Sequence, residues 1–281
     1  MELNRIYNED CLKGMKRIPD GSVDMILCDL PYGTTACSWD EIIPFEPLWE
    51  QYERVIKDNG AIVLTTSQPF TSALVMSKPK LFKHEWIWEK QTASNFMAAK
   101  YSPLKYHESI LVFGKGKVNY NPQKYKVLEI EELITKSKKE LEQIMRDREY
   151  DRFGKVDRRK VVNDSTTNKD FLGSRVARTR NRDTGYRNPK SVLKINKSIN
   201  KNFHPTQKPV ALFEYLIKTY SNKNETVLDN CMGSGTTAIA CINTERNFIG
   251  FELDKTYYEK SLKRIKNHTT QTDIFDVLEG N

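Results

Sequence analysis

The chain alternates short apolar runs with longer stretches whose apolar residues recur at helical spacing. Six runs have the length of a strand: VDMILCD (23–29), AIVLTTS (61–67), EWIWEKQ (85–91), SILVFGKG (109–116), TVLDNC (226–231) and NFIGFELD (247–254). Runs that are mostly apolar are typical of strands buried on both faces of a sheet. Strands separated by helical stretches predict βαβ units and a mainly parallel sheet, hence an α/β fold.

Two helices are predicted with particular boundaries. One covers PLWEQYERVIK (47–57), and Asp58-Asn59-Gly60 is expected to end it. The other covers VALFEYLIKTYS (210–221) and begins after Pro209, a residue favoured at helix starts. Both helices are consistent with the predicted βαβ units.

The pattern changes between residues 118 and 203. Residues 127–149 have the spacing of an amphipathic helix, whereas 152–203 are polar, basic and without a clear period. The second stretch is typical of loops that order on binding. We therefore divide the chain into a first half of an α/β domain (1–117), an insert (118–203) and a second half of the same domain (204–281).

The insert also carries the positive charge. The chain has a formal net charge of +8, and residues 152–203 alone hold 15 basic and 4 acidic residues. A basic patch confined to one segment is the footprint of a polyanion partner, although a solvated loop would have the same composition. The candidate DNA contacts are Arg175, Arg178, Arg180 and Arg182.

The apolar stretches and the cysteines bear on membrane segments, disulfides and metal sites. No apolar stretch approaches 18 residues and the chain starts with the polar MELNRIYNED, so we expect a soluble cytoplasmic protein without a membrane partner. The five cysteines are scattered and form no CxxC pair. They predict reduced thiols, and no metal site is expected.

A glycine-rich turn follows the strand at 226–231. Gly233, Gly235 and Ala238 fit the pattern G-x-G-x-x-[GA], which lets a nucleotide approach the backbone between a strand and a helix. Glu252 lies 19 residues after Gly233 at the end of the next strand, where a carboxylate would hold ribose hydroxyls. The turn predicts a nucleoside-containing cofactor. It is not a Walker loop, because no Lys-Ser/Thr pair follows the glycine.

A second motif, Asp29-Leu30-Pro31-Tyr32, ends the strand at 23–29. Ligands of parallel sheets bind at this carboxyl edge. Pro31 restricts the backbone before it, so the Leu30 carbonyl can point outward beside the Asp29 carboxylate. Two acceptors and the flat face of Tyr32 suit a planar molecule with an amino group. A simple strand-end turn with a solvated Asp29 is the alternative.

These motifs together resemble the amino-methylating DNA methyltransferases. DLPY resembles their [DNS]-P-P-[YF] catalytic motif, and DNCMGSGTT (229–237) resembles their D-P-F-x-G-S-G-T cofactor loop. HPTQKP (204–209) and NEDCLKGM (8–15) are similar to the segments that precede those two motifs. The order of the motifs resembles the circularly permuted β subgroup. The resemblance covers about residues 1–117 and 204–265.

The resemblance implies a fold and a cofactor. The fold is a Rossmann-like seven-stranded S-adenosylmethionine-dependent methyltransferase fold, circularly permuted, with 118–203 as an inserted target-recognition region. By the same resemblance, Asp229, Gly233 and Gly235 cradle the methionine part, Thr236 and Lys208 lie near its carboxylate, Glu252 binds the ribose, and Asp10 meets the adenine edge.

The resemblance also implies a reaction on double-stranded DNA. Asp29 and the Leu30 carbonyl would accept the two amino hydrogens of a flipped adenine, Pro31 would stiffen the turn, and Tyr32 would stack on the base. Asp at the first position resembles the N6-adenine enzymes. N4-cytosine methylation, an RNA or protein substrate, a silent DNA-binding module and an NAD-dependent oxidoreductase are the alternatives. A homodimer and a cognate restriction nuclease are open as partners.

Two departures from the family pattern stand in the motifs. Leu30 replaces the first proline of the catalytic motif, which leaves its backbone carbonyl in place but makes the turn less rigid. Asn230-Cys231 replaces Pro-Phe in the cofactor loop, so we expect an altered apolar wall there.

Overall fold

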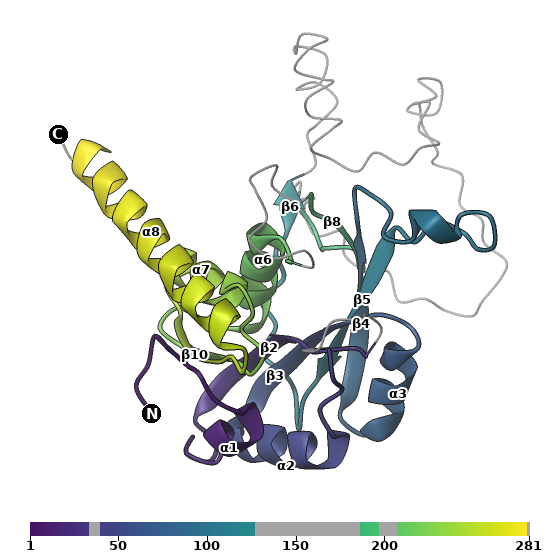
Figure 1. Cartoon of the computed structure of the whole chain (residues 1–281), viewed down its shortest axis with the longest axis horizontal. Coiled ribbons are helices and arrows are strands. Elements are labelled where there is room, and N and C mark those ends of the chain that lie inside the picture. Colours follow the sequence, from purple (N-terminus) through teal and green to yellow (C-terminus); the bar gives the residue numbers. More distant parts are fainter. Residues whose placement is uncertain (34–39, 127–185, 197–206, 280–281) are drawn as a thin grey trace, which may run out of the picture. The chain divides into compact units, whose positions relative to one another are not determined.

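The computed structural model describes residues 1–33, 40–126, 186–196 and 207–279 (Figure 1). In these residues one sheet has eight strands in the order β1-β10-β9-β2-β3-β5-β4-β8. The strands are β1 (Arg5–Tyr7), β2 (Val23–Asp29), β3 (Ile56–Thr66), β4 (Phe82–Glu89), β5 (His107–Phe113), β8 (Val192–Lys194), β9 (Thr226–Asp229) and β10 (Asn247–Phe251). Seven strands are predicted; the eighth is the short β8, which pairs parallel with β4 at the edge of the sheet.

The strand directions confirm the predicted mainly parallel α/β sheet. Neighbours from β1 to β3 all pair parallel, and only β5 is antiparallel to its two neighbours. The first strand of the chain pairs with the last, with Ile6 opposite Gly250. This pairing fits the circularly permuted order that the resemblance implies, and the strand order agrees with the expected Rossmann-like sheet.

Helices cover both faces of the sheet (Figure 1). Alternation along β2 explains the two layers, because Leu27 packs into one core while Ile26 and Cys28 pack into the other. The Leu27 side is covered by α6 (Val210–Tyr220) and α7 (Thr236–Asn243), and the opposite side by α1 (Cys11–Met15), α2 (Phe45–Val55) and α3 (Phe70–Ser77). The other helices in the described residues are η1 (Phe96–Ala98) and α8 (Lys255–Glu279).

The predicted end of the helix at residues 47–57 is wrong. Helix α2 ends at Val55, and Asp58-Asn59-Gly60 lies inside β3 instead of ending the helix. The register between β2 and β3 shifts there, with Val23 opposite Ile56 but Met25 opposite Ala61. A side chain on residue 60 would lie 2.8 Å from the Asp24 carbonyl oxygen. The glycine therefore permits an irregularity in the strand.

The chain divides into two compact units, residues 1–123 with 190–281 and residues 124–189. The second unit contains the described pair β6 (Tyr125–Lys126) and β7 (Tyr186–Arg187). The predicted helix at 127–149 and the four candidate DNA-contacting arginines lie outside the described residues. No helix in the described ranges combines the length and apolar character needed to cross a membrane.

Candidate active site

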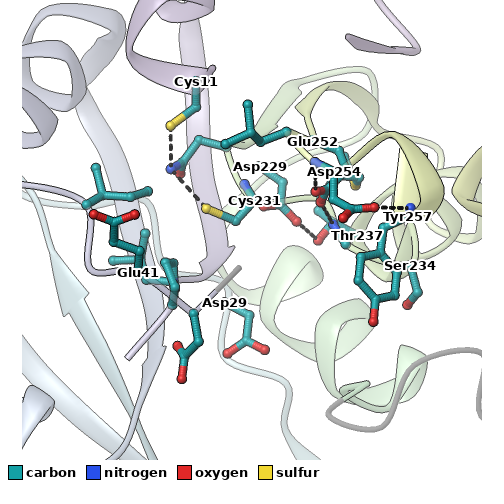
Figure 2. Close-up of a pocket in the computed structure, with 18 of the residues that line it drawn as sticks. Cys11, Asp29, Glu41, Asp229, Cys231, Ser234, Thr237, Glu252, Asp254 and Tyr257 are labelled. Atoms are coloured by element: carbon teal, nitrogen blue, oxygen red, sulfur yellow. Dashed lines mark hydrogen bonds between the residues drawn. The ribbon is translucent and has the colours of Figure 1, made fainter. Parts of the chain in front are cut away.

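A cavity of about 800 Å³ lies at the carboxyl ends of β2, β9 and β10. Its volume is in the range of small-molecule sites. Both predicted motifs contribute to its wall, which includes Asp10, Asp29, Leu30, Pro31, Tyr32, Lys208, Asp229, Gly233, Thr236 and Glu252. Figure 2 shows the carboxylates of Asp29, Asp229 and Glu252 in this region. The structure thus brings the described candidate residues around one cavity, apart from Gly235.

Asp29 is the last residue of β2 and receives three hydrogen bonds from described residues. Its Oδ1 accepts from the Tyr32 hydroxyl at 2.6 Å and from the Thr65 hydroxyl. Its Oδ2 accepts from the Lys208 ammonium at 2.7 Å. The Asp29 side chain is 27% exposed, whereas that of Lys208 is 7% exposed. Asp29 is therefore held firmly and still faces the cavity.

Lys208 links Asp29 to a second carboxylate. Its ammonium lies 3.2 Å from Glu108 Oε2, and Lys90 donates to Glu108 Oε1 at 3.0 Å. Burial alone would lower the pKa of Lys208, but Asp29, Tyr32 and Glu108 together raise it well above its ordinary value. Burial would raise the pKa of Glu108, but Lys208 and Lys90 lower it. Two cations and two anions thus form a buried chain that is neutral overall.

Tyr32 is fixed from both its backbone and its ring. The Asp40 carboxylate accepts from the backbone N–H of Tyr32 at 2.7 Å and of Gly33 at 2.9 Å, which holds the turn after Pro31. The Tyr32 ring packs against Phe70 with centroids 5.5 Å apart. Burial, and next the Asp29 charge, raises the pKa of Tyr32 well above its ordinary value. The hydroxyl therefore remains a donor to Asp29.

The glycine-rich turn has the backbone that its sequence predicts. Gly233 has a φ of +54° and Gly235 a φ of +79°, a region that favours glycine. A Cβ at residue 235 would lie 3.2 Å from the Ser261 Cβ. Gly235 precedes α7 and lets α8 pack closely, whereas Gly233 lines the cavity. Within one motif, Gly235 thus permits helix packing and Gly233 forms part of the cavity wall.

Asp229 ends β9 and holds this turn together. Its Oδ1 accepts from the Cys231 backbone N–H at 3.0 Å, and its Oδ2 accepts from the Thr237 hydroxyl, as Figure 2 shows. Asp229 is 2% exposed and no cation among the described residues pairs with it. Burial raises its pKa to about 7, against an ordinary value of 3.8. Its carboxylate therefore serves the loop as well as the cavity wall.

Glu252 and Asp10 each anchor a neighbouring segment of the rim. Glu252 Oε2 accepts from the Gly233 N–H at 2.7 Å and Oε1 from the Asp254 N–H at 2.8 Å. Burial raises the pKa of Glu252. Asp10 caps α1 by accepting from the Lys13 N–H at 3.0 Å. Both side chains line the cavity with acceptor capacity to spare.

Thr236 is the first residue of α7 and is tied to α8. The Arg264 guanidinium donates to the Thr236 hydroxyl at 3.1 Å and to the Ser234 carbonyl at 2.9 Å. Arg264 lies outside every motif, so its contribution is not readable from the sequence.

The altered wall at Asn230-Cys231 has a local explanation. Asn230 is 3% exposed, and its Oδ1 accepts from the Tyr52 hydroxyl at 2.5 Å. Its Nδ2 faces the Cys11 and Cys231 sulfurs at 3.7 and 3.5 Å (Figure 2). A buried amide is tolerated here because it has partners on both sides.

Sequence reasoning missed several residues that build the site. Thr65, Asp40, Glu108 and Lys90 are absent from the predicted set, and Lys208 lies on Asp29, a contact that the motifs did not indicate. One signal was available for Thr65, since it lies near the end of the next apolar run along the chain; in the structure it pairs with Asp29 in register. The others come from segments with no motif of their own.

Comparison with known proteins identifies the family. Residues 23–263 match the model of the N6/N4 methyltransferases, described as DNA methylase. A Type II methyltransferase of Moraxella bovis, M1.MboII, is 25% identical over 93% of this chain and 96% of its own length. The DNA adenine methyltransferase YhdJ of Escherichia coli (strain K12) is 28% identical over 94% of this chain and 83% of its own length.

A solved structure agrees in fold. The crystal structure of an M1.HpyAVI-SAM complex superposes with a TM-score of 0.55 and 26% identity, covering 92% of this chain and 98% of that one. The family model, which matches residues 23–263, spans strands from both halves of the sheet and both motifs that line the cavity. The chain therefore belongs to the family of N6/N4 DNA methylases.

Proposed function

We propose that this protein transfers the methyl group of S-adenosylmethionine to the N6 amino group of an adenine that has left double-stranded DNA. The observation that supports this most directly is the single cavity at which Asp29, Leu30 and Tyr32 face the loop at 229–236 and Glu252. A methyl donor and an amino acceptor can meet there. Family membership supplies the reaction class.

The cavity suits S-adenosylmethionine. Gly233 exposes backbone to it, and Glu252 and Asp10 offer carboxylate oxygens at the rim for a ribose and a base edge. Asp229 and Thr236 complete the wall, and we assign the methionine part to them. The bound cofactor supplies an electrophilic methyl group on a sulfonium. The protein therefore has no need to remove a proton from the amine before transfer.

Asp29 has one acceptor position left for the target. A carboxylate has about four lone-pair sites, and Tyr32, Thr65 and Lys208 occupy three of them. The fourth can accept one amino hydrogen, and the Leu30 carbonyl, which also lines the cavity, can accept the other. Holding both hydrogens aims the nitrogen lone pair along the line of transfer. It also stabilises the charge that develops on nitrogen.

Lys208 acts as a positioning residue in this scheme. It holds the Asp29 Oδ2 at 2.7 Å and lies between the charges of Asp29 and Glu108. It remains protonated, so it cannot take the proton that the methylated amine releases. Asp29 is the nearest basic oxygen for that proton.

Adenine is favoured over cytosine by two observations. Asp, and not Ser, stands at the first position of the catalytic motif. The relative YhdJ, which matches most of this chain, is named as an adenine methyltransferase. N4-cytosine methylation by the same geometry is the second candidate, because the family includes both activities.

The biological setting belongs to the same proposal. Several relatives are named Type II methyltransferases, which favours a cognate restriction nuclease as partner. We further propose a cytoplasmic enzyme that acts as a homodimer on its DNA site, with the basic insert as target-recognition region. Sedimentation of the free protein and its DNA complex tests the dimer. Digestion of methylated and unmethylated plasmid by candidate nucleases tests the pairing.

The deciding experiment identifies the methylated nucleoside. The protein is incubated with labelled S-adenosylmethionine and mixed-sequence duplex DNA, which is then digested for nucleoside mass spectrometry. N6-methyladenine is the expected product. N4-methylcytosine would retain the mechanism and reverse the choice of base, whereas no methylated nucleoside with cofactor bound would overturn the proposal.

A further inference from the structure

The connection between β4 and β5, residues 90–106, projects at the ligand-binding edge of the sheet; we call it the arm. Strand β4 runs in the same direction as β2, because β5 is antiparallel both to β4 and to β3, the parallel neighbour of β2. The carboxyl end of β4 therefore lies at the same edge as Asp29. Figure 1 draws the arm, with η1 in it, beyond the ends of β4 and β5.

The arm exposes large apolar side chains. Phe96 is 72% exposed, Met97 86% and Tyr101 89%, and these three residues form what we call the arm tip. Of the fourteen large hydrophobic residues that are exposed in the described part of the chain, five lie in these seventeen residues. Such a concentration on a surface marks an interaction site, since single exposed residues need no explanation but a group does.

Charge indicates the kind of partner. The arm contains Lys90, Lys100 and Lys105 and no aspartate or glutamate. Lys90 is buried on Glu108, which leaves Lys100 and Lys105 as the cations beside the rings. Rings interleaved with cations, without acids, suit a nucleic acid, whose bases stack on rings and whose phosphates pair with lysines.

The arm has an ordered base connected to the catalytic edge. Lys90 N–H donates to the Tyr106 carbonyl at 2.6 Å, and the Asn95 amide donates to the Pro103 carbonyl at 3.0 Å. The Lys105 ammonium contacts the Ser67 hydroxyl, just after β3. Lys90 reaches Glu108 and through it Lys208 and Asp29. The tip is therefore carried at a defined place relative to Asp29.

We propose that the arm tip contacts the bases of duplex DNA beside the adenine that enters the Asp29 cavity, with Phe96 and Tyr101 stacking, Met97 filling the vacated space and Lys100 pairing with a phosphate. The inference rests on the proposed function, because only a base taken out of the duplex leaves such a space. Extrusion breaks the stacking and pairing of that base. Contacts made by exposed rings at that edge offset part of the cost.

The experiment compares a Phe96→Ala/Tyr101→Ala variant with a Met76→Ala control. Met76 is 73% exposed on α3, outside the arm, so the control removes a similarly exposed apolar side chain. Three quantities are measured: kcat/KM for a duplex, kcat/KM for the matching single strand, and KM for S-adenosylmethionine. Fluorescence of 2-aminopurine at the target position reports extrusion, and anisotropy reports duplex binding without requiring activity.

The double variant should lose at least about tenfold in duplex kcat/KM and most of the 2-aminopurine signal, since both stacking rings are removed. Single-strand kcat/KM and the KM for cofactor should change less than twofold. A Phe96→Tyr/Tyr101→Phe variant keeps both rings and should retain the wild-type values. Lys100→Ala should flatten the log–log salt dependence of duplex binding by about 0.9.

Duplex kinetics and fluorescence within twofold of the Met76→Ala control would overturn the inference. A change in sedimentation of the free protein with unchanged DNA kinetics would also overturn it, and would assign the tip to contact between two copies of this chain. If the wild type methylates no DNA at all, the proposed function fails instead. Weaker duplex binding by the double variant would then still support the arm as a DNA contact.

Discussion

Two neighbouring strands of this sheet end in aspartate, but the two side chains differ in exposure and in the groups that bind them. Asp29 at the end of β2 is 27% exposed and pairs with the Lys208 ammonium. Asp229 at the end of β9 is 2% exposed and is held by a backbone N–H and a hydroxyl. Both strands point to one cavity, so position in the fold does not distinguish them.

The difference shows how the surroundings of an aspartate can fit it for either catalysis or structural support. The Lys208 ammonium holds the partly exposed Asp29 carboxylate in a defined orientation toward the cavity. Burial without a cation favours the neutral form, and it raises the pKa of Asp229 to about 7. We therefore assign transfer to Asp29 and loop architecture, with a share of the cofactor site, to Asp229. The predictions below test this division in decreasing order of their expected effect on methyl transfer.

The largest effect is expected for Asp29→Ala. Removing the carboxylate takes away an acceptor for the target amine, so the single-turnover rate of methylation should fall at least about a thousandfold. Affinity for S-adenosylmethionine, measured by calorimetry, should stay within a few-fold of wild type, because we place Asp29 at the amine. Near-normal turnover of this variant would show that the catalytic assignment is wrong.

Lys208→Met should have the next largest effect. Its loss leaves Asp29 and Glu108 without the cation between them, and breaking a buried ion pair costs about 3–5 kcal/mol. We expect kcat to fall about a hundredfold and the KM for DNA to change little, with Lys208→Arg recovering part of kcat. Stopped-flow methylation and urea unfolding measure the two effects separately. A rise in KM for S-adenosylmethionine with unchanged kcat would instead place Lys208 at the cofactor carboxylate.

The motifs predicted which strand ends line the cavity, because a strand-end acid and a glycine turn are local in sequence. The mainly parallel sheet followed from the apolar runs and the permutation from the family resemblance, and the strand order agrees with both. The Lys208–Glu108–Lys90 chain could not be read in the same way. Its members come from three separate segments, and only the folded sheet edge brings them within hydrogen-bonding distance.

The helix end at residues 58–60 was mispredicted for a related reason. Asp-Asn-Gly is a turn signal in isolation, but pairing of β3 with β2 absorbs the same residues as an irregular stretch of strand. Tertiary pairing outweighed local preference there.

Asp229→Asn tests the other side of the comparison through pH. The wild-type carboxyl has a pKa of about 7 when folded and 3.8 as its ordinary value, so the unfolded chain ionises first. Between pH 4 and 7 the folded state therefore loses stability as pH rises, by up to about 1.4 kcal/mol per unit. Asparagine does not titrate, so urea unfolding should show this slope only in the wild type.

For methyl transfer, Asp229→Asn should cost about tenfold or less, seen mainly as weaker binding of S-adenosylmethionine. Equal pH slopes for the two proteins would contradict a neutral buried Asp229. A loss of turnover as large as that of Asp29→Ala, with cofactor still bound, would remove the distinction between the two strand ends.

The smallest effect is expected for Thr65→Val, which sharpens the account of Asp29. Valine keeps the shape of threonine but cannot donate to Asp29 Oδ1, whereas Tyr32 and Lys208 remain in place. One hydrogen bond to a charged group is worth about 1.5–3 kcal/mol, and part of this returns when the freed lone pair accepts an amino hydrogen. We therefore expect kcat to fall only about three- to tenfold. Thr65→Ser restores the hydroxyl and should restore kcat, so a serine variant as slow as valine would show that Thr65 acts through packing alone.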